Sequence, residues 1–320
     1  MIVVTGGAGF IGSNIVRALN QQGETDILIV DNLGKSAKYL NLNKLKFSDY
    51  IDKVEFIENL PAILEGRDVK AIIHQGACSA TTELDGNYLI SNNYEYSKTL
   101  LHYCLDHKIS FIYASSASVY GNGDNGFTEK SECEYALNGY AFSKLIFDNY
   151  VRRVVFDSKA VKDNSFSVVG LRYFNVYGYQ ENHKGSMSSV PFHFFQQSKS
   201  GGEIKIFEGS ENFYRDFIFI EDVVNVVMHF YKNPAQGIFN CGTGIERSFG
   251  QMANVFTSID PSCKIVKIPF PDHLKGKYQA FTKADVAALR GAGYKAAFLT
   301  LEEGIKKYHA MLEKSNGLFV

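Results

Sequence analysis

The sequence predicts an α/β fold, a doubly wound parallel sheet with a smaller α/β domain beside it. Short apolar runs alternate with helical patterns through the first half of the 320-residue chain, as in parallel strands joined by right-handed crossovers. This alternation breaks down near residue 176 and returns near 215, which indicates two interleaved units. We expect the larger domain at residues 1–175 plus about 215–245, and the smaller substrate domain at 176–214 plus about 246–320.

The first element is an apolar strand that ends at Thr5 and turns into a helical pattern through Gly6, Gly9 and Gly12. Glycine suits this turn because it accepts positive φ angles and because a Cβ would keep the backbone away from a phosphate. The N–H groups at the start of the following helix would face a pyrophosphate. Asp31 lies about 20 residues beyond the loop, as in dinucleotide-binding units. The sequence therefore predicts a Rossmann-like NAD(P)-binding domain.

The remaining elements are predicted from apolar runs and helical periodicity. We expect strands at residues 26–31, 54–57, 69–75, 110–114 and 166–172, and helices over about 87–106 and 135–156. Residues 175–214 are rich in glycine, serine, asparagine and phenylalanine and show no clean alternation. Order returns with a strand at 216–220, a helix from about 221 and a segment at 238–244, before a mixed tail.

Composition excludes several classes of protein. The chain is 45% hydrophobic and 21% charged, which is ordinary for a globular protein, and its net charge of -1 gives no footprint for nucleic acid or anionic lipid. We expect no membrane span and no signal peptide, hence a cytoplasmic protein. Five scattered cysteines argue against a disulfide framework or a zinc site, and we expect no metal.

A tyrosine and a lysine in the predicted helix at 135–156 have a spacing that suits acid–base chemistry. Tyr140 and Lys144 are four residues apart, so they share one face of that helix. A nearby ammonium favours the phenolate and can bring a tyrosine into working range as a base. Ser115, Ser116 and Ser118 follow a predicted strand, at the sheet edge where ligands bind in open α/β proteins. Such a pair also occurs by chance on solvated helices.

Together, the glycine-rich opening, the strand end at Ser116 and the Tyr140–Lys144 pair resemble the extended short-chain dehydrogenase/reductases. Further stretches narrow the resemblance to nucleotide-sugar epimerases that act on ADP-heptose, and these stretches are residues 74–79, 93–97, 172–178, 183–187, 207–213 and 277–281. The similarity covers residues 1 to about 301. The chain departs from the family pattern at two places. Gln75 stands where the family often has an acid, and residues 35–45, which include Lys38, differ from the family sequence.

The resemblance implies an isomerase that inverts carbon 6 of ADP-heptose for the lipopolysaccharide core, by transient oxidation and re-reduction with one tightly bound cofactor per subunit. It implies a homo-oligomer, with a pentamer as the expectation. The catalytic residues would be Tyr140, Lys184, Lys144 and Ser116. The cofactor contacts would be Gly6, Gly9, Phe10, Ile11, Gly12, Asp31, Asn32, Lys38, Lys53, Gln75, Gly76, Ala77, Cys78, Ser79, Asn92, Lys144, Val176 and Lys184. The substrate contacts would be Asn175, Ser186, His193, Phe207, Glu208, Gly209, Ser210, Arg215 and Tyr278.

The implied chemistry is coherent, because inversion removes a hydride from one face of a carbon and returns it to the other. The hydroxyl points differently in the two epimers, so two acid–base groups, Tyr140 and Lys184, serve better than one. Taken alone, Lys184 would be a solvated loop lysine and His193 a buried core residue. Arg215 suits a diphosphate, and we favour this interpretation over a surface salt bridge with Asp216.

Three alternatives stay open at this point. A UDP-sugar 4-epimerase uses the same Tyr–Lys pair but has no need of Lys184. A 4,6-dehydratase requires an acid pair just after Ser116, where Ser118 and Val119 stand. A catalytically silent NAD(P)-binding protein would not need an intact Ser116, Tyr140 and Lys144.

The choice of cofactor rests on opposing signals. A carboxylate such as Asp31 accepts from the ribose 2′-hydroxyl of NAD and repels the 2′-phosphate of NADP. Asn32, Lys35, Lys38 and Lys53 lie close enough in sequence to favour NADP. The family generally uses NADP with the same Asp-Asn pair, so we expect NADP, with NAD as the alternative.

Overall fold

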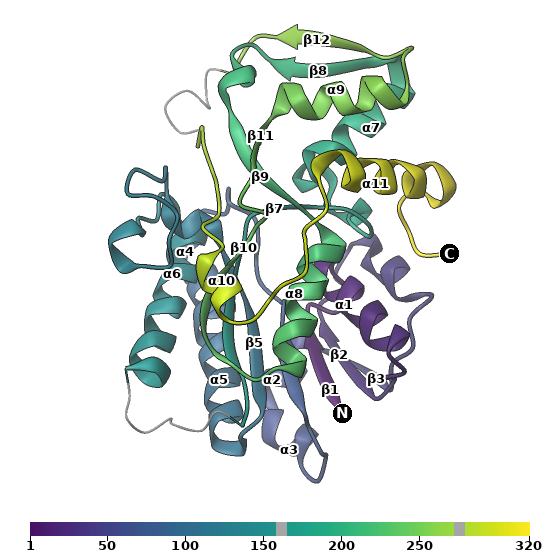
Figure 1. Cartoon of the computed structure of the whole chain (residues 1–320). Coiled ribbons are helices and arrows are strands. Elements are labelled where there is room, and N and C mark those ends of the chain that lie inside the picture. Colours follow the sequence, from purple (N-terminus) through teal and green to yellow (C-terminus); the bar gives the residue numbers. More distant parts are fainter. Residues whose placement is uncertain (158–164, 272–278) are drawn as a thin grey trace.

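The computed structural model describes residues 1–157, 165–271 and 279–320. Its centre is a seven-stranded sheet of order β10-β6-β5-β4-β1-β2-β3, in which every neighbouring pair is parallel. The predicted doubly wound sheet is therefore confirmed (Figure 1). Its strands, in chain order, are β1 Ile2–Thr5, β2 Ile27–Asp31, β3 Asp49–Asp52, β4 Ala71–His74, β5 Ser110–Ser116, β6 Val168–Tyr173 and β10 Gln236–Cys241.

Alternate side chains of the sheet enter two separate hydrophobic cores, because successive residues of a strand point to opposite faces. In β1, Ile2 and Val4 belong to one core and Val3 to the other. The first core is covered by α1 Phe10–Gln21 and α8 Ile220–Lys232. The second is covered by α2 Lys53–Glu58, α3 Leu60–Leu64, α5 Tyr96–His107 and α6 Gly139–Val151.

Two smaller sheets and three helices lie beyond the carboxyl edge of the central sheet (Figure 1). The three-stranded sheet pairs β9 Tyr214–Phe219 with β7 Asn175–Tyr177 (parallel) and with β11 Glu246–Ser248 (antiparallel). The two-stranded sheet pairs β8 Glu203–Phe207 with β12 Lys264–Ile268. The helices are α7 Val190–Gly201, α9 Phe249–Ile259 and α11 Leu301–Ser315. The short helices α4 Gly86–Leu89 and α10 Ala287–Gly291 complete the α-helices of the described residues.

The strand predicted at 54–57 is wrong, because these residues belong to α2. The Asp52 carboxylate caps that helix by accepting from the Val54 amide, and Phe56 is buried while Val54 is half exposed. The strand of this region is instead β3. It pairs with β2 at the edge of the sheet. It was not predicted because its sequence, Asp49–Asp52, is not an apolar run.

Four further features of the helices differ from the sequence prediction or add to it. The helix expected from residue 135 begins at Gly139, because Asn138 caps it by accepting from the Ala141 amide. The helix expected over 87–106 contains a π-helical turn at Ile90–Glu95. A second π-helical turn, Arg152–Phe156, follows α6. Helix α7 lies within the region that showed no clean pattern.

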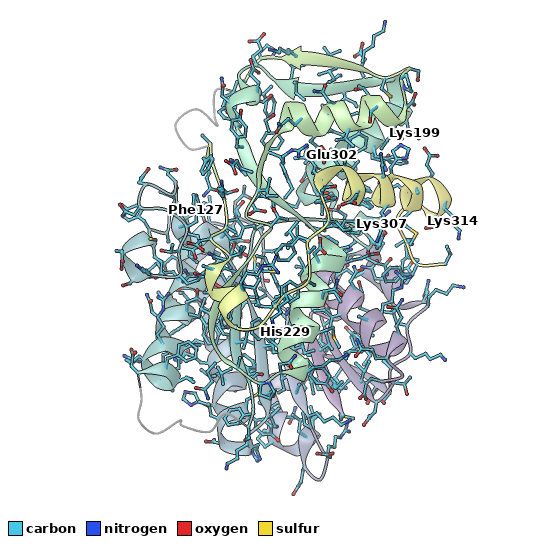
Figure 2. All side chains as sticks on the ribbon, viewed as in Figure 1. Phe127, Lys199, His229, Glu302, Lys307 and Lys314 are labelled. Carbon is cyan, nitrogen blue, oxygen red and sulfur yellow. The ribbon has the colours of Figure 1, made fainter. Side chains whose placement is uncertain are left out.

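Helix α11 forms ion pairs on its exposed face, one with α8 of the larger domain and one with the neighbouring strand β11. Lys307 pairs with Glu221 of α8, with 2.7 Å between Nζ and Oε2, and Glu302 pairs with Arg247 of β11. Figure 2 labels Lys307 and Glu302 on α11. The five cysteines, all in the described part of the chain, are free thiols. Within the same residues, no helix is long and apolar enough to cross a membrane.

Candidate active site

A cavity of about 1070 Å³ lies along the carboxyl ends of the central strands. Its lining includes Thr5 at the end of β1, Asp31 at the end of β2, Ser116 at the end of β5 and Tyr173 at the end of β6. In doubly wound sheets this edge is where ligands bind. The cavity brings together all four predicted catalytic residues and every predicted cofactor contact except Cys78.

The glycine-rich loop forms one wall of this cavity, and its close approach to α1 requires glycine. Gly6 has a φ of 67°, and a Cβ on Gly12 would overlap the carbonyl oxygen of Gly6. Among the described residues, none caps the first turn of α1 with a side chain. The amides that open α1 therefore remain available to an anion, which fits the pyrophosphate of a dinucleotide.

Asp31 is held by three donors at the end of β2. Its Oδ2 accepts from the Ala8 amide at 2.9 Å, and its Oδ1 accepts from the Asn32 amide at 2.7 Å and from Lys38 Nζ at 2.6 Å. The sequence suggested cations near Asp31, and the structure forms an ion pair from one of them.

Further basic groups lie in the same part of the cavity. Lys53 donates to the Asn92 side chain, and partial burial lowers the pKa of its ammonium. Burial also lowers the pKa of His183 to about 4, with Lys38 and Lys184 acting in the same direction. His183 is therefore neutral at pH 7, and the fixed positive charges here are lysines.

Tyr140 and Lys144 share one face of α6, and both line the cavity on the same side as Ser116. Burial raises the pKa of the Tyr140 phenol, and a hydrogen bond with Ser116 opposes that shift. Lys144, one helical turn further along α6, donates from Nζ to the Ala114 carbonyl at 3.0 Å. Burial lowers the pKa of Lys144 to about 8, with Asp148 opposing.

The hydroxyl of Ser116 is oriented by the turn that follows β5. It accepts from the Ser118 amide at 3.2 Å and from the Ser118 hydroxyl at 2.9 Å. Because both of these bonds use its oxygen as the acceptor, its own hydrogen is available to donate. Ser116 can therefore donate toward Tyr140 or toward an oxygen bound beside it.

A buried ion network lies behind these residues and joins α6 to the sheet. Asp148, one turn after Lys144, accepts from Tyr113 Oη at 3.0 Å, Ser115 Oγ at 2.9 Å and Arg172 Nε at 2.9 Å. Arg172 is fully buried and also pairs with Glu134. The network fixes the helix that carries Tyr140 and Lys144 against β5 and β6.

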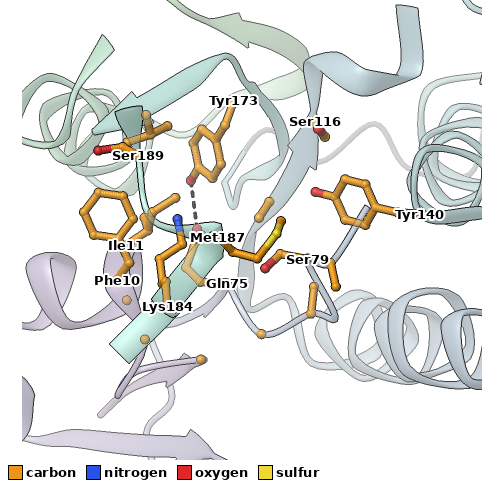
Figure 3. A pocket seen from close by; sticks show the side chains of 18 of the residues that line it. Phe10, Ile11, Gln75, Ser79, Ser116, Tyr140, Tyr173, Lys184, Met187 and Ser189 are labelled. Atoms are coloured by element: carbon orange, nitrogen blue, oxygen red, sulfur yellow. Dashed lines mark hydrogen bonds between the residues drawn. The ribbon is translucent and has the colours of Figure 1, made fainter. Parts of the chain in front are cut away.

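Lys184 comes from a 3₁₀ segment, Asn182–Met187, on the other side of the cavity (Figure 3). Its ammonium lies 5.0 Å from the centre of the Phe10 ring and 3.9 Å from Glu181 Oε2. Burial lowers the pKa of this ammonium, and Glu181 opposes the shift. Figure 3 shows Tyr140 and Ser116 on one side and Lys184 with Phe10 on the other.

The predicted substrate contacts are divided by the structure. Asn175 and Arg215 line the cavity, whereas the others that the structure describes lie outside its lining: Ser186, His193, Phe207, Glu208, Gly209 and Ser210. Tyr278 lies outside the described residues. The Asp216 carboxylate accepts from the amides of Thr243, Gly244 and Ala284 and from the Thr243 hydroxyl, so loop donors hold it. The salt bridge with Arg215 is the less favoured interpretation of the sequence.

Sequence reasoning missed several residues that shape the cavity. Tyr173 donates to Gln75 Oε1 at 2.9 Å, a contact drawn in Figure 3. Phe217 and Phe249 line the side nearest Arg215, whose guanidinium lies 6.0 Å from the Phe249 ring centre. The aromatic residues carried no distinguishing spacing, although the resemblance did cover the stretch that contains Tyr173.

The described residues hold no group of three or more His, Cys, Asp or Glu that could bind a metal ion. The cavity itself presents a tyrosine, lysines, a serine and an anion-binding loop. A loop that accommodates a pyrophosphate beside two acid–base groups on opposite sides of the cavity suits a dinucleotide enzyme that handles a hydroxyl-bearing carbon.

Comparisons with known proteins agree with this geometry. Residues 2–242 match the model of the NAD dependent epimerase/dehydratase family. An ADP-L-glycero-D-manno-heptose-6-epimerase of Brachyspira hyodysenteriae is 57% identical over 319 residues, 99% of each chain. The crystal structure of the Helicobacter pylori enzyme of that name has a TM-score of 0.83 at 30% identity, over 98% of this chain and 96% of that one. A Thermotoga maritima UDP-glucose 4-epimerase with UDP-glucose has a TM-score of 0.81 at 26% identity, over 98% and 99%. The chain belongs to the NAD dependent epimerase/dehydratase family.

Proposed function

We propose that this protein inverts carbon 6 of ADP-D-glycero-D-manno-heptose to give ADP-L-glycero-D-manno-heptose. The single observation that carries the proposal is the position of Lys184 and Tyr140 on opposite sides of one cavity. The relative with 57% identity over 99% of its length carries the name of this activity, and the 4-epimerase from Thermotoga maritima is more distant.

A bound nicotinamide dinucleotide supplies the acceptor and the source of the hydride that leaves and returns to carbon 6. In this proposal Tyr140 takes or gives the proton of the 6-hydroxyl in one epimer, and Lys184 does so in the other. Ser116 donates a hydrogen bond to the same oxygen, and Lys144 supports Tyr140 from the next turn of α6. Arg215 and Asn175 would contact the nucleotide-sugar, with Arg215 matching its diphosphate.

The proposed cofactor is NADP, held by Gly6, Gly9 and Gly12 at its pyrophosphate. Lys38 and Lys53 support this choice, because each places a cation near the end of β2, and Lys38 offsets the charge of Asp31. NAD is the alternative. We further propose a cytoplasmic homo-oligomer whose substrate domain comprises 176–214 and about 246–320.

The test is to incubate the purified protein with ADP-D-glycero-D-manno-heptose in deuterated water and to follow the sugar by proton NMR. We expect conversion to the L-glycero epimer with no deuterium at carbon 6, because the hydride does not exchange with solvent. UDP-galactose is assayed in parallel. Turnover of UDP-galactose without turnover of the ADP-heptose would replace this function with that of a 4-epimerase.

A further inference from the structure

A fully buried carboxylate lies three residues before Lys184. Glu181 has no exposed surface, and its Oε1 accepts from Ser189 Oγ at 2.6 Å, from Tyr308 Oη at 2.8 Å and from the Gly178 amide at 3.4 Å. Its Oε2 accepts from the Ser189 amide at 2.6 Å. These neutral donors tie together the turn after β7, the start of α7 and the helix α11.

Lys184 is the cation that faces this carboxylate. Its Nζ lies 3.9 Å from Glu181 Oε2, close enough for strong attraction but beyond hydrogen-bond distance. The Lys184 side chain is 25% exposed, toward the cavity, and the Glu181 side chain is not exposed at all. The carboxylate therefore attracts the ammonium electrostatically without accepting a hydrogen bond from it. The N–H groups of Lys184 remain able to donate to other acceptors.

The other groups around Lys184 contribute little negative charge. The Phe10 ring of α1 faces the ammonium at 5.0 Å, and His183 is neutral at pH 7 because its pKa is about 4. Lys38 and Asp31 form an ion pair with each other at the end of β2, so their charges largely cancel. Among the described charged groups, Glu181 is the one whose field raises the pKa of Lys184.

The peptide that carries both residues is also fixed independently of the carboxylate. The Gln180 amide donates to the Gly317 carbonyl at 2.9 Å. Asn41 Nδ2 donates to the carbonyls of Gln180 at 3.0 Å and of Ala8, in the glycine-rich loop, at 2.9 Å. Loss of the Glu181 charge would therefore leave this peptide attached to both the cofactor loop and the carboxyl-terminal tail.

We propose that Glu181 is a positioning residue that sets the proton affinity and the location of Lys184 at the cavity wall. Burial makes the ammonium a stronger acid, and the fixed carboxylate 3.9 Å away offsets part of that effect. This inference rests on the proposed function, in which Lys184 exchanges a proton with the sugar. Glu181 itself does not touch substrate or cofactor.

The test measures the titration of Lys184 directly, in the full-length protein with its bound cofactor. Trace acetic anhydride is applied across a pH series, and the acetylation of Lys184 is quantified by mass spectrometry relative to exposed Lys306. Glu181→Gln removes the charge while keeping the side-chain volume. We expect its labelling midpoint to fall by about one pH unit or more, because an opposite charge at this distance shifts a pKa by about that amount.

Tyr308→Phe is the matched control, because it removes one hydrogen bond from the same carboxylate without changing its charge. We expect the wild-type midpoint in that variant. An unchanged midpoint in folded Glu181→Gln, or an equal shift in Tyr308→Phe, would overturn the proposal. If Glu181→Gln does not fold, Glu181→Asp decides. It retains the charge but draws it back from Nζ, so a smaller fall supports the proposal and an unchanged midpoint overturns it.

The labelling midpoint does not depend on which sugar is the substrate. If the wild-type protein does not convert ADP-heptose, the proposed function is wrong, but the expected shift in the labelling of Lys184 is unaffected. Conversely, an active enzyme whose Lys184 titrates identically with and without the Glu181 charge would sink only this inference.

Discussion

The ammonium of Lys38 lies 2.6 Å from the carboxylate of Asp31, at the end of β2 where the sequence signals for NAD and NADP conflict. The carboxylate also accepts from the amides of Ala8 and Asn32, so it is both neutralised and turned toward the glycine-rich loop. An acid held in this way repels a 2′-phosphate less than a lone carboxylate would. The ion pair therefore explains how the protein could bind NADP although the Asp31 carboxylate by itself repels the 2′-phosphate.

We expect Lys38→Met to change the cofactor that the protein retains from NADP to NAD. The variant loses a cation and leaves the negative charge of Asp31 unpaired, and both effects disfavour a 2′-phosphate. A hydrogen bond to a charged group contributes roughly 1.5–3 kcal/mol, so the ratio of the two affinities should change by about tenfold or more. Cofactor released by denaturation identifies the species by mass, and calorimetry gives the two dissociation constants. Exposed Lys35→Met is the control, and an unaltered ratio in Lys38→Met would remove Lys38 from cofactor selection.

Tyr140→Phe and Lys184→Met should each abolish epimerisation, because each removes one of the two proposed acid–base groups. A loss of about 10²–10⁴-fold in kcat is the usual effect of such a group. The measurement is the initial rate of conversion of ADP-D-glycero-D-manno-heptose. Tyr135→Phe and Lys306→Met make the same chemical changes at exposed positions and should retain full activity. Near-normal turnover in either cavity variant contradicts the two-base mechanism.

The rate should fall as the pH rises through about 8. Burial lowers the pKa of Lys144 to about 8, so its ammonium is present below that pH and is lost above it. Since the charged form supports Tyr140 in the proposed mechanism, kcat should decline on the alkaline side. The test is kcat against pH between about 6.5 and 9.5. In Lys144→Arg the cation persists, so the alkaline decline near 8 should disappear even if the rate is lower. The same decline in this variant would assign it to another group.

Asp148→Asn should destabilise the fold by about 3–5 kcal/mol, because it leaves the fully buried guanidinium of Arg172 without this counter-charge. The loss is measured as the change in the free energy of unfolding in urea. Glu95→Gln, at the partly exposed pair with Lys98, removes a carboxylate of the same type and should cost about 1 kcal/mol or less. Equal losses of unfolding free energy in the two variants would show that burial does not determine how much an ion pair contributes to stability.

Several features of this protein follow from local sequence alone. The glycine-rich turn could be recognised because Gly6, Gly9 and Gly12 answer a local steric requirement that other residues cannot meet. Tyr140 and Lys144 could be placed together because four residues span about one helical turn. The parallel sheet followed from the alternation of apolar runs with helical periodicity, which reflects burial on both faces.

Other features were decided only by the tertiary structure, because they join residues far apart in the chain. No local pattern brings Tyr308 to Glu181, or Arg172 to Asp148, since side chains from separate elements meet only after the layers pack. Residues 54–57 had an apolar pattern typical of a strand, yet the cap at Asp52 and the burial of Phe56 make them helical.

The opposition of Lys184 to Tyr140 across the cavity belongs to this second group. Their roles were suggested by resemblance, but the sequence gives no distance between a 3₁₀ segment after β7 and helix α6. The sequence by itself determined the sheet, the anion-binding turn and the Tyr–Lys pair, because each depends on neighbours within a few residues. Packing determined which charges are buried and which cations face the cavity, because the field at a side chain depends on everything that surrounds it.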